Sequence, residues 1–497
     1  MARRWSTAWY PGTRTDHTRP QGEVETPSWA GGRPALREGG TPSLPARSGQ
    51  NAVISQRIRV CWGTGALGAA LLMNAIGVLA LFYMVSVLGI EPGLAGTLVF
   101  LTKLLDVVSD PIVGSWSDRI KSPAGRRRPF LLAGAFVSAS AFALIFTTPV
   151  FNAQWLTAAY IFLALSTYTI GYTLFNVPYM AMPAEMTDSY HERSAIHGYR
   201  MVFIATGVFL ATSISPLILD RLGRENWNAY AVIGAGGAAV ILISMLTTYF
   251  GTARARFTDA GVERINVFRQ FSPILGNPHF LRLIAVKAAQ LLGIAASQAT
   301  IVFFVVHYLR LPLTVLFFYG VVVTIVSTLA TPLLVAISKR IGKRETYLLA
   351  AFCYLAGVSS WMLAGPGEPL PYILARGAII AIAASGNIVM AMSMLTDTIE
   401  FDARRTGVRR EGVYTAVYSF VEKFTFAMGP LIVGWAMQIA GFDRSLSDEA
   451  LQTPEVGRAL LLGMSYMPTF VGCVAILLLT RYRLTDRDLI KLRAASS

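Results

Sequence analysis

The fold is decided by the sequence KLLDVVSDP at residues 103–111, which lies inside an apolar segment of about 94–116. A segment of that length crosses a bilayer as one helix. Asp106 and Asp110 stand four residues apart, so a helix places both carboxyl groups on one face. Charged groups at membrane depth cost about 2.5–3.5 kcal/mol each and usually mark an ion or substrate pathway. The alternative, acids near a helix end that reach interfacial water, accounts poorly for two acids on one face with Lys103 a turn earlier.

Composition indicates that the bilayer is the solvent of this chain. Hydrophobic residues make up 54% of the 497 positions and charged residues only 14%, against about 25% charged in soluble domains. Apolar segments that approach or exceed the length needed to span a hydrocarbon core recur along the sequence. They lie near 60–88, 94–117, 129–148, 155–183, 197–219, 228–250, 281–308, 313–337, 346–364, 372–396, 413–440 and 459–480. The sequence therefore predicts an all-α polytopic membrane protein.

The distribution of Lys and Arg predicts the orientation of these segments. A net charge of +15 raises the question of nucleic-acid binding, but the basic residues concentrate in every second connection, as at 119–128, 339–344 and 404–410. Cytoplasmic loops of membrane proteins carry such an excess. We therefore expect a multi-pass protein of the cell (inner) membrane, with both termini in the cytoplasm and no nucleic-acid partner.

The charge pattern also divides the chain into two halves. The basic connections at 117–128 and 338–344 each follow the second segment of a group of six, which predicts bundles at 58–250 and 281–482. Two parallel halves of six helices are the architecture of major-facilitator transporters, which hold a solute between the halves near mid-membrane.

Three further regions lie outside the two bundles. Residues 1–57 are rich in Arg, Gly, Pro, Ser and Thr and cannot bury a core, which predicts a disordered basic tail or a start codon assigned too far upstream. Residues 251–280 are expected to form a cytoplasmic linker, and residues 483–497 a cytoplasmic tail.

Three blocks of sequence resemble one known family. The first is DVVSDPIVGSWSDR at 106–119, continuing into GRRRPF at 125–130. The second runs from NVPY at 176–179 to YR at 199–200, and the third holds TGVRREG at 406–412 and Lys423. These blocks are similar to those of the glycoside–pentoside–hexuronide:cation symporters of the major facilitator superfamily. The resemblance covers most of the chain from about 60 to 480 and implies twelve transmembrane helices in two six-helix bundles.

The resemblance implies a cation site. Asp106 and Asp110 fall on the family's cation-binding acids, Thr173 on a hydroxyl of the same site, and Ser109 beside them. Hard oxygen ligands suit Na⁺, so Asp106 and Asp110 would be the metal ligands of a sodium-coupled protein. An acid pair that resists double ionisation would instead hold a proton. The coupling ion, Na⁺ or H⁺, stays open, and no other cofactor is expected.

The resemblance also implies a solute site. Lys423 falls on a lysine of the eleventh helix that faces the acids, Lys103 on a basic residue that precedes them, and Arg200 on an arginine at the substrate cavity. The other candidate substrate-binding residues are Asn74, Tyr83, Asn176, Tyr179 and Met180. The alternatives are a lysine at 423 that reaches toward the interface, and tyrosine rings that pack between helices.

The chain departs from the family where sugar hydroxyls are bound. Ala70 and Asn176 stand near the positions of two sugar-binding acids, and a carboxylate suits sugars because it accepts hydrogen bonds from two hydroxyls. The expected function is cation-coupled symport of a sugar, glycoside or hexuronide by alternating access. A lysolipid or other amphiphile is the alternative solute.

Other functions fit the sequence less well. A membrane sensor that does not transport would need no intact ion site, and no nucleophile–base pair, metal cluster or phosphate loop indicates an enzyme. Four residues of the second connection are interpreted either as a cytoplasmic gate whose ion pairs form and break as the halves rock, or as topology signals alone. They are Asp118, Arg126, Arg127 and Arg128. The expected partners are a small solute, the coupling cation and the lipid bilayer, and a monomer is the default oligomeric state.

Overall fold

The computed structural model describes residues 54–484 except 121, 123, 124, 150, 188, 256–275, 409, 444–451 and 483, and of 190 and 191 only the backbone. The elements in this part of the chain are helices, and twelve helical spans are long and apolar enough to cross a membrane. The all-α fold with twelve spans is confirmed. The expected tail up to residue 53, most of the linker and nearly all of 483–497 lie outside the described residues.

Each half contributes six spans, and several spans contain a π-helical turn (η). The first half comprises α1 (Gln56–Phe82) with η1 (Tyr83–Val87), α2 (Pro92–Arg119), α3 (Arg128–Phe146), α4 (Gln154–Met186), α5 (Tyr190–Phe209) with η2 (Leu210–Ile214) and α6 (Ser215–Leu222), and α7 (Trp227–Gly251). The second half comprises α9 (Pro278–Phe303) with η3 (Phe304–Tyr308), α10 (Thr314–Ile341), α11 (Lys343–Ser359) with the 3₁₀ turn η4 (Ser360–Leu363), α12 (Leu370–Thr406), α13 (Glu411–Ile439), and α14 (Pro454–Leu461) with η5 (Leu462–Tyr466) and α15 (Met467–Thr480).

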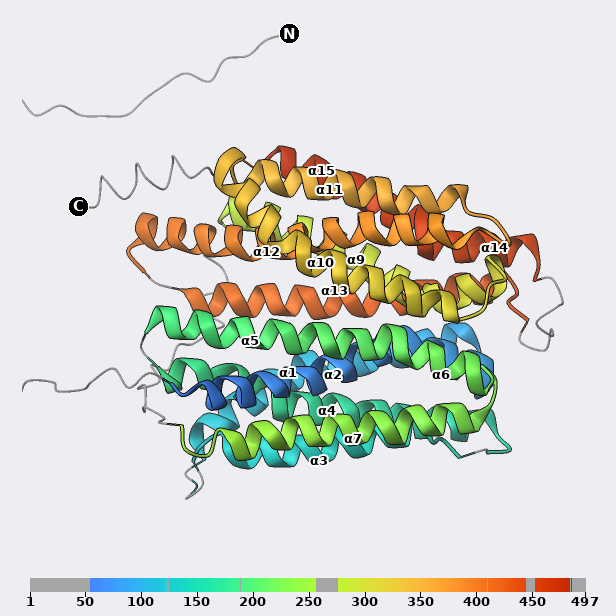
Figure 1. Ribbon diagram of the computed structural model, residues 1–497, viewed down its shortest axis with the longest axis horizontal. Coiled ribbons are helices and arrows are strands. Elements are labelled where there is room, and N and C mark those ends of the chain that lie inside the picture. Colours follow the sequence, from blue (N-terminus) through green and yellow to red (C-terminus); the bar gives the residue numbers. More distant parts are fainter. Residues whose placement is uncertain are drawn as a thin grey trace, which may run out of the picture. The chain divides into compact units, whose positions relative to one another are not determined.

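Successive spans run in opposite directions, so the basic connections lie at the same end of the helices (Figure 1). We call this the basic end; α2 ends there at Arg119, and α11 begins there at Lys343. The opposite end is the one at which α2 begins at Pro92 and α13 ends at Ile439.

Several helices are longer than the apolar segments that predict them. The segment at 372–396 belongs to a helix that continues to Thr406, and the segment at 155–183 to one that continues to Met186. The added turns of α12 carry charged residues, which are stable in a helix once it has left the hydrocarbon. Hydropathy therefore ends the predicted helix where the membrane core ends.

The helices pack mainly within their own half, and a few of them join the two halves. Within the first half α1 packs against α5 and α7, and α3 against α4 and α7. Within the second half α9 packs against α13 and α15, and α12 against α10 and α11. The halves meet along α2 with α13, α1 with α9, and α10 with η2.

The first span of each half ends in the same way. A π-helical turn closes both spans, with the amide of Leu88 donating to the carbonyl of Tyr83 (3.0 Å) and that of Leu309 to Phe304 (2.8 Å). The next residue has a positive φ in each case, 71° at Gly89 and 55° at Arg310. Arg310 is the one non-glycine residue with positive φ in the described part of the chain. The repeated ending shows the internal similarity of the halves at the level of single hydrogen bonds.

Candidate functional site

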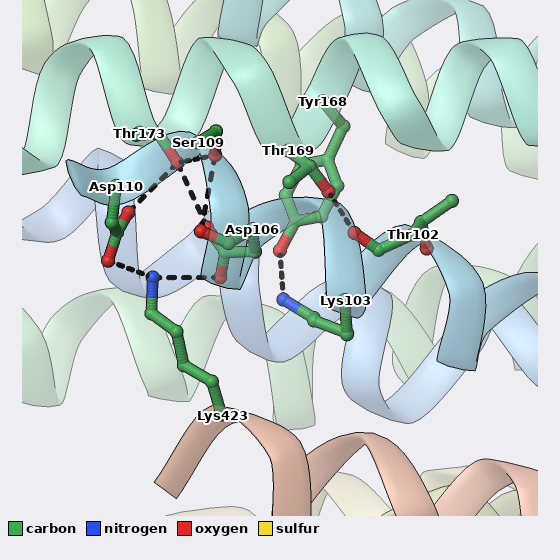
Figure 2. A network of polar contacts seen from close by, with 9 residues as sticks. All are labelled: Thr102, Lys103, Asp106, Ser109, Asp110, Tyr168, Thr169, Thr173 and Lys423. Atoms are coloured by element: carbon green, nitrogen blue, oxygen red, sulfur yellow. Dashed lines mark hydrogen bonds and ion pairs between the residues drawn. The ribbon is translucent and has the colours of Figure 1, made fainter. Parts of the chain in front are cut away.

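Asp106 and Asp110 lie on one face in the middle of α2, as the four-residue spacing predicts. Asp106 is 3% exposed, and the side chain of Asp110 is 27% exposed. The hydroxyl of Thr173 on α4 lies 2.9 Å from Asp106 Oδ1, 3.2 Å from Asp110 Oδ1 and 3.1 Å from the hydroxyl of Ser109 (Figure 2). Thr173 has one proton to donate, so it binds one carboxylate at a time. The four predicted cation-site residues therefore form one cluster of oxygen atoms.

Lys423 reaches this cluster from the second half. Its Nζ lies 3.1 Å from Asp106 Oδ2 and forms a shorter ion pair with Asp110 Oδ2. Figure 2 shows the ammonium group of α13 placed between the two carboxyl groups of α2. Lys423 therefore does not extend toward the membrane interface, which was the alternative that the sequence left open. Two acids and one ammonium leave one negative charge to be balanced when both acids are ionised.

A second hydroxyl contact holds α4 against α2 next to the cluster. Thr169 donates to the backbone carbonyl of Thr102 at 3.3 Å, one turn from the contact between Thr173 and the acids. Threonine and serine hydroxyls commonly join membrane helices in this way, because their polar groups otherwise lie unsatisfied in hydrocarbon. The polar residues of α4 thus fix the depth at which Thr173 meets the acids.

Lys103 has a partner that the sequence did not indicate. Its Nζ lies 3.1 Å from the hydroxyl of Tyr168 and 5.1 Å from the centre of that ring. Figure 2 shows this pair beside the acid cluster, one turn along α2 from Asp106. The described hydrogen bond of Lys103 is therefore to a hydroxyl and not to either carboxylate of the cluster. Tyr168 stands five residues before Thr173 and belongs to the same site.

The other predicted solute residues lie in two different environments. Tyr83 and Tyr179 are fully buried, with ring centres 4.5 Å from those of Tyr230 and Trp62 respectively. Their rings pack between helices in this conformation, which is the alternative that the sequence left open. Asn74 donates to the carbonyl of Ala70 in its own helix at 2.9 Å.

Asn176, Met180 and Arg200 are less enclosed. Asn176 and Arg200 are half-buried, Met180 is 39% exposed, and the Nε of Arg200 is buried without a hydrogen-bond partner. Asn176 and Met180 are one turn apart on α4. The described contacts do not join these residues to the acid cluster, so their roles stay predictions.

The predicted gate residues form an ion-pair network within the first half. Arg127 lies 2.9 Å from Asp118 and 2.8 Å from Glu185, and Arg126 lies 2.6 Å from Glu185. Arg128 donates to the carbonyl of Tyr249 at 3.1 Å. These contacts join α2, α3, α4 and α7 at the basic end, and they do not bridge the two halves. Glu185, buried at the end of α4, is the common acceptor that the gate prediction missed.

The second half has a corresponding ion pair. Lys343 at the start of α11 lies 2.6 Å from Asp397 on α12. Arg127 precedes the third span of its half and Lys343 begins the third span of the other, and each pairs with an acid on the fourth span. The role of these networks in gating stays a prediction.

The halves contact each other toward the opposite end. The amide of Gly93 donates to Gln438 Oε1 at 2.8 Å, and Gln438 Nε2 donates to Glu91 at 3.2 Å. Asp220 accepts from the amide of Leu313 at 2.8 Å and from the hydroxyl of Thr314. The described hydrogen bonds and ion pairs between the halves all lie between Lys423 and this end. A cavity of about 680 Å³ opens between α12 and α13 at the basic end.

Carboxylates, hydroxyls and lysines at mid-depth between two six-helix bundles define the class of this protein as a membrane transporter of the major-facilitator fold. A solved structure from the proton-dependent oligopeptide transporters shares the fold, with a TM-score of 0.62 at 14% identity over 89% of this chain and 100% of that one. Residues 61–486 match the model of the MFS/sugar transport protein family, and the chain belongs to that family.

Relatives of known name are similar over most of their length. The chain is 27% identical to the glucuronide carrier protein homolog of Escherichia coli, over 83% of this chain and 89% of the relative. It is 23% identical to the isoprimeverose transporter of Lactiplantibacillus pentosus, over 76% and 79% of the two chains. The chain is therefore a secondary transporter rather than an enzyme.

Proposed function

We propose that this protein couples the entry of a cation, Na⁺ or H⁺, to the uptake of a sugar, glycoside or hexuronide. The observation that carries the proposal is the position of Lys423, an ammonium of one half bound between two acids of the other. Ionisable groups at this depth are costly and are kept where an ion or solute passes. Two relatives, the glucuronide carrier protein homolog and the isoprimeverose transporter, support the solute class by their names.

The cluster supplies a physical route to coupling. A cation that binds Asp106, Asp110 and Thr173 takes the place of the ammonium of Lys423, because both compete for the same carboxylate oxygens. The ion pair between α2 and α13 is then weakened, which changes the relative free energy of the arrangements of the two halves. A solute that binds one arrangement better is bound more tightly when the cation is present, and the effect is reciprocal. The same oxygen cluster serves Na⁺ as ligands or H⁺ as a shared site.

The orientation follows from the basic connections. With the basic end in the cytoplasm of a cell (inner) membrane, contacts between the halves close the extracytoplasmic side, whereas none of the described hydrogen bonds and ion pairs joins the halves at the cytoplasmic end. In alternating access this is an inward-facing arrangement. Release of cation and solute to the cytoplasm takes place from it.

The solute class has one alternative with its own observation. Ala70 is buried, and neither Ala70 nor Asn176 offers a carboxylate for sugar hydroxyls. A lysolipid would need no such acid, because its binding rests on apolar area and a headgroup. We favour the sugar because Lys103, Asp110 and Lys423 place several polar groups near the middle of the membrane.

Uptake into proteoliposomes tests the proposal. The panel is lactose, isoprimeverose, methyl β-D-glucuronide and lysophosphatidylcholine, each with a Na⁺ gradient, a pH gradient or neither. We expect a sugar of the panel to accumulate only with one of the gradients, and Asp110→Asn to abolish that accumulation. Glu345→Gln, at an exposed residue of the basic end, is the control. Accumulation of lysophosphatidylcholine alone would establish the alternative, and an Asp110→Asn protein as active as the wild type would refute the cation site.

A further inference from the structure

The residue before Lys423 forms a second ion pair, toward the second half. Glu422 Oε1 lies 3.5 Å from Nζ of Lys287 on α9. The side chain of Lys287 is 9% exposed and that of Glu422 is 44% exposed. Consecutive residues of a helix are about 100° apart, so α13 directs Lys423 to α2 and Glu422 to α9. One helix turn thus carries opposite charges into the two halves.

Glu422 lies well inside the span of α13, and its side chain is partly exposed. It follows the start of α13 at Glu411 by eleven residues, or about 17 Å along the axis. A charged carboxylate with this exposure at such depth faces a water-filled space, since hydrocarbon would not tolerate it. Glu411 and Thr415 line the cavity at the basic end, and Glu422 follows Thr415 by two turns on the same face. Glu422 is therefore placed at the inner end of the helix face that lines the cavity.

Two buried polar groups without hydrogen-bond partners lie close to Lys287. Gln290, one turn from Lys287 on α9, accepts a hydrogen bond from Tyr347 at 2.7 Å, but its Nε2 is buried without a partner. Tyr418 has its ring 5.6 Å from Nζ of Lys287, and its hydroxyl is also buried without a partner. Both residues are at least 95% buried. Buried polar atoms are almost always hydrogen-bonded, so these atoms point to a bound ligand or water.

We infer that Glu422, held in place by Lys287, binds hydroxyl groups of the transported solute, and that this solute is polyhydroxylated. The inference rests on the proposed function and adds a wall of the solute site in the second half. A carboxylate accepts hydrogen bonds from two neighbouring hydroxyls, and an ammonium donates to a third. The two groups together match a sugar ring, whereas a lysolipid tail offers nothing for them to bind.

Equilibrium binding to detergent-purified protein tests the inference. The probes are the p-nitrophenyl glycosides of α-D-galactose, β-D-glucose, β-D-xylose and β-D-glucuronic acid. We expect Glu422→Gln to weaken the tightest of them by at least about tenfold, the effect of one hydrogen bond to a charged group. The control is Glu411→Gln, which removes the same charge at the cavity rim and should stay within about twofold of the wild type. The increase in Tm that Na⁺ or a lower pH gives the wild type should persist in Glu422→Gln.

Loss of the ion pair could itself disturb folding, so a second variant is needed. Glu422→Gln together with Lys287→Gln keeps the charge balance and leaves no uncompensated buried charge. This double variant should fold and show the same weakened binding. Binding within twofold of the wild type in either variant would overturn the inference, as would loss of the cation-dependent Tm increase together with glycoside binding. If the wild type bound none of the four glycosides, the sugar solute of the proposed function would fail, and this inference with it.

Discussion

Replacing Gly96 by alanine is expected to drive the halves out of the conformation described here. Gly96 lies where α2 crosses α13, and a Cβ there would be 3.1 Å from Cα of Leu431 and closer still to the carbonyl of Pro430. Backbone atoms cannot move aside as the end of a side chain does, so the helices must separate at the opposite end. Such overpacking costs about 1–3 kcal/mol. Once the halves are apart at that end, the same alanine is free of strain and favours the helix by about 1 kcal/mol.

The strain alone shifts the balance between the two arrangements by about 5–150-fold. Phe317 lies at the opposite end with its ring centre 6.2 Å from that of Phe209 across the halves, so Phe317→Cys reports whether this end is open. In right-side-out vesicles of a variant lacking the native cysteines, Gly96→Ala should raise the rate of labelling by a membrane-impermeant maleimide at least about fivefold. Gly236→Ala, whose Cβ would meet nothing within 4 Å, should leave the rate unchanged. Unchanged labelling in a folded Gly96→Ala protein would refute the reasoning.

Three further substitutions have defined outcomes. Thr173→Val removes the hydroxyl shared by the two acids. The cation concentration that gives half of the maximal increase in Tm should therefore rise about tenfold. Thr167→Val is the control, because the hydroxyl of Thr167 donates to a carbonyl of its own helix, and it should leave that concentration unchanged. Lys423→Gln leaves the buried acids without their ammonium, which lowers the stability by about 3–5 kcal/mol. In the same melting assay, a cation should raise the Tm of this variant more than it raises the Tm of the wild type. An equal increase in the two proteins would contradict competition between the cation and Lys423 for one site. Arg310→Gly should raise the Tm, since a non-glycine residue in the left-handed region costs about 1–2 kcal/mol, and a lower Tm would show that the arginine side chain outweighs its backbone.

The sequence predicts the fold and the acid cluster because both rest on local rules. Apolar length sets the spans, and a spacing of four residues puts Asp106 and Asp110 on one face whatever the neighbouring helices do. The family resemblance supplies Thr173 and Lys423, which lie 67 and 313 residues from the acids they contact. The structure places both at those acids.

Other parts of the site could not be read from the sequence. Tyr168 as the partner of Lys103, Glu185 as the acceptor of Arg126 and Arg127, and the pairing of Glu422 with Lys287 each depend on which faces of distant helices meet. A hydropathy pattern indicates that a residue is inside the membrane, but it does not indicate which residues of the other helices it contacts. The arrangement of the halves is likewise a property of contacts such as Asp220 with Leu313, which join the fifth span to the eighth.

The depth of the acid cluster would make the binding of the proposed cation sensitive to voltage. Asp106 lies about 21 Å along α2 from Pro92 and about 20 Å from Arg119, at 1.5 Å per residue. An ion that reaches it from either side has crossed about half of the membrane. Moving one charge across the whole membrane changes its free energy by about 2.3 kcal/mol per 100 mV. Moving it half of the way changes the free energy by about 1.2 kcal/mol, which corresponds to about a sevenfold change in apparent affinity per 100 mV. A potential that is negative inside would therefore load the site from the outside with cations even before any concentration gradient is counted.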